Sequence, residues 1–70
     1  MDKETYYAET LKVARNLRKL TQKELAALIG VTVGTVSQWE CGLRVPQLRH
    51  RRMLADALGE FRLLEERDQA

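Results

Sequence analysis

The chain has 70 residues, of which 44% are hydrophobic, and its formal net charge is +2. This length fits one small domain and leaves too little chain for an active-site cleft beside an independent core, so we do not expect an enzyme. No apolar run is long enough to cross a bilayer and the N-terminus lacks a signal-peptide pattern, which argues against membrane insertion and export. The single cysteine, Cys41, and the single histidine, His50, provide neither an internal disulfide nor a metal cluster. We therefore expect a cytoplasmic protein without metal or cofactor.

The small net charge hides an uneven distribution along the chain. Residues 12–52 hold nine basic residues against two acidic ones, a net charge of +7, while residues 1–11 carry −2 and residues 53–70 carry −3. A basic block between acidic flanks is typical of a protein that binds a polyanion. The alternative is a solvated basic face that has no partner.

Apolar residues recur at helical spacing with almost no alternation of the kind seen in strands, so we predict an all-α, five-helix bundle. Gly42 ends the third helix and begins a loop that runs to Pro46. The first helix is expected from near Asp2 or Thr5 to about Leu17, the second from Gln22 to Ile29 and the third from Val33 to about Cys41. A short fourth helix starts at about Gln47. The fifth helix carries Leu54, Ala55 and Leu58 and ends at Gly59.

The second and third helices form the most informative pair. Thr21 followed by Glu24 fits a reciprocal capping box, which predicts the start of the second helix. Gly30 can end that helix with a positive φ, and Thr32 can cap the next. The apolar positions Leu25, Ile29, Val36 and Trp39 then close a small core between two helices joined by a tight turn. Many helical hairpins share this pattern and bind no nucleic acid.

Residues 11 to 59 resemble the helix-turn-helix domain of the Xre family, the Cro and phage-repressor type. The positions that carry the resemblance are Thr21-Gln22, Glu24-Leu25-Ala26, Gly30-Val31-Thr32, Val36, Trp39-Glu40, Gly42, Arg44, Pro46, Leu54-Ala55 and Leu58-Gly59. The resemblance implies a lambda-repressor-like domain of five helices that binds operator DNA, usually as a dimer, and usually regulates transcription. We accordingly divide the chain into an extension of the first helix (residues 1–10), the helix-turn-helix domain (11–59) and an apolar and acidic tail (60–70).

In such domains the third helix lies in the major groove with its N-terminal side chains toward the bases. We expect Val33, Gly34, Ser37 and Gln38 to face outward there. Gln38 can pair with adenine, Val33 can cover a thymine methyl group, and the Ser37 hydroxyl can donate or accept. Gly34 has no side chain to offer. Either it lets the helix approach the groove closely, or the protein depends on the shape of its site rather than on direct contacts.

Another set of residues is expected to contact the DNA backbone. The resemblance implies such a contact for Gln22, which begins the second helix, where the helix dipole favours a phosphate. Lys12, Arg18 and Lys19 on or after the first helix are as easily explained by solvation alone. The remaining candidates for phosphate contacts are Lys23, Thr32, Thr35, Arg44 and Arg49.

The family pattern also implies an ion pair between Arg15 and Glu40. A partly buried pair would fix the angle of the third helix, whereas a surface pair would contribute little to stability. Apolar residues near the C-terminus are expected to form a homodimer surface, and these are Leu58, Phe61, Leu63 and Leu64. The alternative is that Phe61 and Leu64 fold back onto the chain's own last helix. Residues 65–70 are expected to be a frayed tail.

These observations favour a sequence-specific regulator, most simply a repressor, that binds a palindromic site on double-stranded DNA. An antitoxin that also masks a toxin, or the controller protein of a restriction-modification operon, would carry the same domain. A protein-interaction module with a basic face is the alternative from another class. An enzyme is least favoured, because no acid-base constellation accompanies the lone cysteine and histidine.

Overall fold

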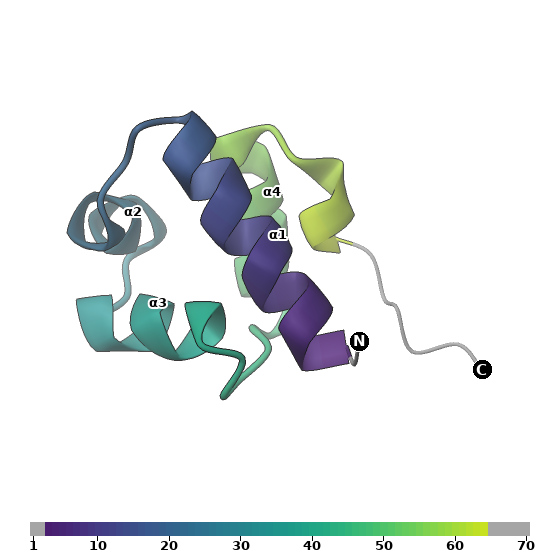
Figure 1. Cartoon of the computed structure of the whole chain (residues 1–70). Helices are drawn as coiled ribbons and strands as arrows, with labels where there is room; N and C mark the ends of the chain where they lie inside the picture. Colours follow the sequence, from purple (N-terminus) through teal and green to yellow (C-terminus); the bar gives the residue numbers. More distant parts are fainter. Residues whose placement is uncertain (1–2, 65–70) are drawn as a thin grey trace.

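The computed structural model describes residues 3–64 and contains helices and turns in that range, with no strand. Figure 1 shows α1 crossing the middle of the molecule, with α2 and α3 to one side of it and α4 behind it. The elements are α1 (Lys3–Leu17), α2 (Gln22–Ile29), α3 (Val33–Glu40), α4 (Leu48–Leu58) and the short 3-10 helix η1 (Phe61–Leu64). The all-α prediction is confirmed. The predicted start near Asp2 and the predicted tail from Glu65 to Ala70 lie outside the described residues.

The predicted count of five α-helices is wrong, because the fourth and fifth helices are one continuous α4. Its 11 residues contain no glycine or proline. Pro46 lies before it and Gly59 ends it, so nothing within it interrupts the hydrogen-bond ladder. Leu54, Ala55 and Leu58 are buried along one side of this single helix. The described chain therefore contains four α-helices followed by one 3-10 turn.

Every element contributes a side chain to one shared core. A fully buried residue comes from each of α1, α2, α3, α4 and η1, and these residues are Leu11, Leu25, Val36, Leu54 and Leu63. Burial of such aliphatic side chains contributes about 1.5 to 3 kcal/mol each. Because α3 reaches this core through Val36 and Trp39, its position is fixed relative to the rest of the fold.

The helix ends follow the local signals in the sequence. Oγ1 of Thr21 accepts a hydrogen bond from the Glu24 amide at 3.0 Å, and Oε1 of Glu24 accepts one from the Thr21 amide at 2.8 Å. This reciprocal pair is the capping box, and it satisfies two amides that the helix cannot. At the other end of α2, Gly30 has a φ of 84° and its amide donates to the Ala26 carbonyl at 2.8 Å. The chain can therefore turn at once toward α3.

Arg18 joins the end of α1 to the end of α4. Its Nε donates to the carbonyl oxygen of Leu58 at 3.1 Å, which caps the C-terminus of α4. Gly59 follows with a φ of 66°, and a Cβ there would collide with Nη2 of Arg18. This contact gives Arg18 a structural role within the domain.

The C-terminal apolar residues divide between core and surface. Leu58 and Leu63 are buried in the chain's own core, and Leu64 packs against it half-buried. The prediction of a dimer surface is therefore wrong for Leu58 and Leu63, because their side chains already have partners within one copy. Phe61 differs, since 76% of it is exposed.

Among the helices that the structure describes, none has the length and apolarity that a membrane span requires.

Candidate nucleic-acid interface

The turn between α2 and α3 sets which side of α3 faces solvent. Oγ1 of Thr32 accepts a hydrogen bond from the Thr35 amide at 3.1 Å, and the two hydroxyl oxygens lie 2.9 Å apart. This N-cap begins α3 directly after the turn. The apolar residues of α3, Val36 and Trp39, are then buried against the core. Among the described residues, the opposite side of α3 is left mostly exposed to solvent.

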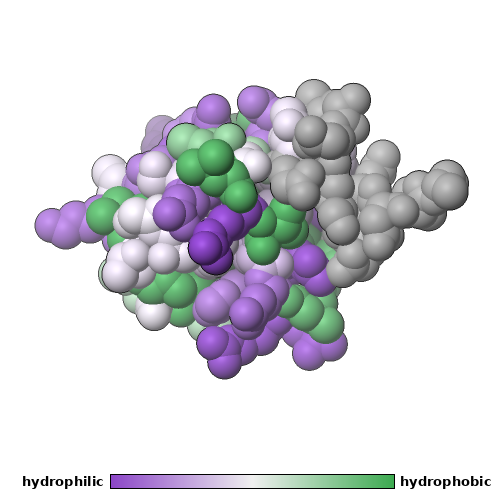
Figure 2. Space-filling view, turned by 90° about the horizontal axis from the view of Figure 1, so that it is seen from below, coloured by the Kyte–Doolittle hydropathy of each residue, from purple (hydrophilic) through white to green (hydrophobic). Residues whose placement is uncertain are grey.

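The predicted base-contacting residues lie on that outer side. Val33, Gly34 and Gln38 are exposed, and Ser37 is half-buried. They form two pairs with the i, i+4 spacing that places side chains on one side of a helix, Val33 with Ser37 and Gly34 with Gln38. Figure 2 shows the molecule from the side on which α3 lies in Figure 1, and its apolar groups there are separate and lie among hydrophilic ones. This surface does not have the continuous apolar area that a core-like protein interface would use.

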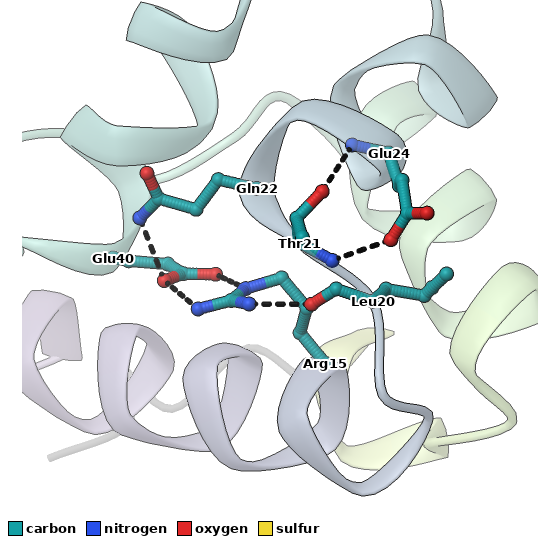
Figure 3. A network of polar contacts seen from close by, with 6 residues as sticks. All are labelled: Arg15, Leu20, Thr21, Gln22, Glu24 and Glu40. Atoms are coloured by element: carbon teal, nitrogen blue, oxygen red, sulfur yellow. Dashed lines mark hydrogen bonds and ion pairs between the residues drawn. The ribbon is translucent and has the colours of Figure 1, made fainter.

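An ion pair joins α1 to the last residue of α3 (Figure 3). Nε of Arg15 donates to Oε2 of Glu40 at 2.6 Å, and Nη2 donates to Oε1 at 3.0 Å. The side chains are only 12% and 3% exposed, so the pair is largely buried. The third nitrogen of the guanidinium, Nη1, donates to the Leu20 carbonyl at 2.6 Å. The bidentate hydrogen bonds to Glu40 raise the pKa of Arg15 above its ordinary value.

Gln22 completes this network, a role that its sequence pattern did not predict. Its Nε2 donates to Oε1 of Glu40 at 3.0 Å (Figure 3). A carboxylate accepts and cannot donate, so the nitrogen of the amide must face Glu40. The amide group of Gln22 is thereby held by a contact 18 residues away in sequence, and its carbonyl oxygen points away from Glu40. No local pattern could have indicated this, because the two residues are adjacent only in the folded chain.

The predicted backbone-contacting residues occupy different environments. Lys23, Arg44 and Arg49 are exposed, so their charges remain available to a ligand. The side-chain hydroxyl groups of Thr32 and Thr35 share a hydrogen bond in the N-cap, which positions both of them at the start of α3. Of the doubtful residues, Lys12 and Lys19 are exposed, while Arg18 contacts the end of α4 as described above.

A hollow lies beside the C-terminal half of α3, between it and the start of α4. His50, which lines the hollow, lies tilted against Trp39, with ring centroids 5.5 Å apart and an interplanar angle of 48°. Gln38 lines both this hollow and the outer side of α3. The lining residues are Thr35, Gln38, Trp39, Leu43, Arg44, Val45, Pro46, Gln47 and His50. No local sequence pattern indicates that Gln47 and His50 line this hollow, because their place there depends on how α4 approaches α3.

A helix-turn-helix family model matches residues 11–64. The chain belongs to the Xre-type helix-turn-helix family. Xre-type domains are DNA-binding regulatory domains, so the match supports a DNA-binding regulator. Neither a curated protein nor a solved structure matches the chain. The matched residues include both helices of the tight pair, α2 and α3.

Proposed function

We propose that this protein is a sequence-specific transcriptional regulator, acting as a repressor, that inserts α3 into the major groove of double-stranded DNA. The observation that carries the proposal is the two-sided character of α3. Its inner side is buried through Val36 and Trp39, and its last residue is held by Arg15, while its outer side is exposed. A major groove about 12 Å wide admits one helix, and it displays a distinct pattern for each base pair. The outer side can therefore contact bases without disturbing the core.

The basic and polar residues around α3 suit the phosphates on either side of the groove. We assign Lys23, Arg44 and Arg49 to these phosphates, because all three are exposed. Gln22 contributes through the part of its amide that Glu40 does not hold, and the Thr32 and Thr35 hydroxyls flank the start of α3. Such contacts set affinity and register, whereas Val33, Gly34, Ser37 and Gln38 set sequence preference.

One domain of this size covers half of a site, so we propose that two copies bind a palindrome with half-sites about 34 Å apart. Phe61 supports this part of the proposal because it is an exposed aromatic residue on η1, the same short helix that carries the half-buried Leu64. An aromatic side chain of this kind can anchor a small interface. The cytoplasm is the compartment that suits such a regulator with a single exposed thiol, at Cys41.

The experiment is selection of bound duplexes from a random-sequence pool at about 0.15 M salt, where nonspecific phosphate contacts are weakened. The proposal predicts enrichment of an inverted repeat with a half-site spacing of one helical turn. Binding that occurs only at low salt and enriches no motif would contradict it. That result would favour a protein-interaction module whose basic face binds an acidic partner.

A further inference from the structure

The hollow between α3 and the start of α4 has the volume of a small-molecule binding site. Its volume is about 460 Å³, and such sites commonly measure about 300 to 1,000 Å³. It is lined by residues of α3, by the first residues of α4 and by the loop that joins the two helices. This space exceeds what one aromatic ring requires, so the hollow can take a small organic molecule.

One part of the lining is apolar and fixed in place. Trp39 and Pro46 are buried, and Val45 packs partly buried against the core. The ring of His50 lies against the ring of Trp39, as described above. Because the fold itself holds these side chains, they keep their positions whether or not a ligand is bound. A flat ring fits such a surface, since aromatic rings bury a large area and pack favourably against other rings.

The rest of the lining is polar, and its charge favours an anion. Gln38, Arg44 and Gln47 line the hollow and are exposed. No acidic side chain is among the lining residues that the structure describes. Gln47 is also the N-cap residue of α4 and makes no side-chain capping hydrogen bond, so the positive end of that helix borders the hollow as well. A carboxylate is the matching group for Arg44, because a guanidinium binds both of its oxygens through parallel hydrogen bonds.

Two of the lining residues also belong to the proposed DNA interface. Gln38 lies on the outer side of α3, and Arg44 is assigned to a phosphate. A ligand that binds Arg44 and covers Gln38 withdraws both residues from DNA. Ligand and operator then exclude each other, and each lowers the affinity for the other by the same factor.

We propose that the hollow is an effector site for a small aromatic carboxylate, and that the bound effector releases the protein from its operator. The ring of the effector lies against Trp39 and Pro46, and its carboxylate binds Arg44. The site itself does not depend on the proposed DNA-binding function, whereas its regulatory role rests on that function.

The first test measures ligand binding without DNA. Trp39 is the only tryptophan of the chain, so heteronuclear NMR gives one indole N–H resonance, and this resonance reports on the hollow. The probes are benzoate and the larger naphthoate, with benzamide and naphthamide as their neutral counterparts and acetate as a carboxylate without a ring. We expect both aromatic carboxylates to shift the resonance to saturation. They should bind about tenfold more tightly than the amides, which lack the charge-assisted contact with Arg44.

Two pairs of variants locate the bound probe. Arg44→Gln should weaken benzoate binding about tenfold and leave benzamide binding unchanged. Its matched control, Arg49→Gln, changes an exposed arginine that does not line the hollow, so it should change neither. Leu43→Ala should weaken the binding of both probes severalfold, because it removes apolar surface from the lining. Leu28→Ala on α2 is the control, since this exposed leucine lies outside the hollow.

The second test adds the operator selected from the random pool. At a benzoate concentration ten times its dissociation constant, mutually exclusive binding lowers the apparent affinity for the operator about tenfold. Sodium acetate at the same concentration is the control, because it matches the ionic strength on which DNA binding depends.

The outcomes separate the effector site from the function to which it is linked. If neither aromatic carboxylate shifts the indole resonance, or if acetate and the amides shift it equally, the effector site is overturned and the DNA-binding function stands. Benzoate binding that Arg44→Gln leaves unchanged would overturn the site as well. If benzoate binds but operator affinity in benzoate equals that in acetate, the regulatory role is overturned. If the wild-type protein selects no operator, the proposed function fails, and the titration without DNA still decides the site.

Discussion

The ion pair between Arg15 and Glu40 gives the clearest stability prediction, through the substitution Arg15→Ala. Removal of the guanidinium leaves a carboxylate that is 3% exposed with Gln22 as its remaining hydrogen-bond donor among the contacts drawn in Figure 3. It also removes the donor to the Leu20 carbonyl. Breaking a buried pair by deleting one partner costs about 3 to 5 kcal/mol, because the other charge stays in a poorly solvated position.

That cost is large for a chain of this length. At about 0.05 to 0.15 kcal/mol per residue, 70 residues give a total stability of about 4 to 10 kcal/mol. A loss of 1 kcal/mol lowers the Tm of a small domain by about 4 to 8 °C, so we expect Arg15→Ala to lower it by about 12 °C or more. Arg15→Lys keeps the charge but cannot make the bidentate contact, so its Tm should lie between those of wild type and Arg15→Ala.

Thermal unfolding followed by circular dichroism measures the effect. Lys12→Ala is the matched control, since Lys12 is an exposed cation on the same helix, and its Tm should stay within about 2 °C of wild type. If Arg15→Ala melts as close to wild type as the control does, the pair behaves as a surface ion pair and the reasoning is refuted.

Three further predictions concern single residues. Gly59→Ala should lower the Tm by about 4 °C or more, because φ is 66° and the new Cβ meets Arg18, and an unchanged Tm would contradict this. Tyr7→Phe should keep or raise the Tm, because the buried phenolic oxygen has no hydrogen-bond partner among the described residues. Burial raises the pKa of Tyr7, so the folded state keeps its proton above about pH 10 while the unfolded state loses it. Wild type should therefore lose stability above that pH, and Tyr7→Phe should lose less, as urea titrations at pH 8 and pH 11 would show. Arg49→Ala should reduce the slope of log affinity against log salt by about 0.9 without changing the selected motif, and an unchanged slope would remove Arg49 from the interface.

The parts of the fold that the sequence predicts well are those determined by neighbouring residues. The bounds of α2 follow from the capping box at Thr21 and from Gly30, both of which act within one helical turn. The exposed side of α3 follows in the same way from the positions of Val36 and Trp39, because helical periodicity places the remaining residues opposite them.

The parts that the sequence does not predict depend on contacts between distant segments. Leu63 looks like exposed apolar surface in the sequence, yet it is fully buried because η1 turns back toward α1 and α4. Gln22 looks like a simple phosphate contact, yet Glu40 holds its amide. The two short helices predicted after Pro46 are one helix, since α4 has one continuous buried side. Each of these features requires the approach of elements that local patterns do not specify.

We infer that the outer side of α3 contacts the bases, and parallel selections with wild type and Gln38→Ala provide the sharpest test. We expect both proteins to enrich the same inverted repeat and the variant to lose preference at one base pair in each half-site. A variant motif identical to that of wild type at every position would contradict the claim, since the exposed amide of Gln38 would then contribute nothing to base recognition.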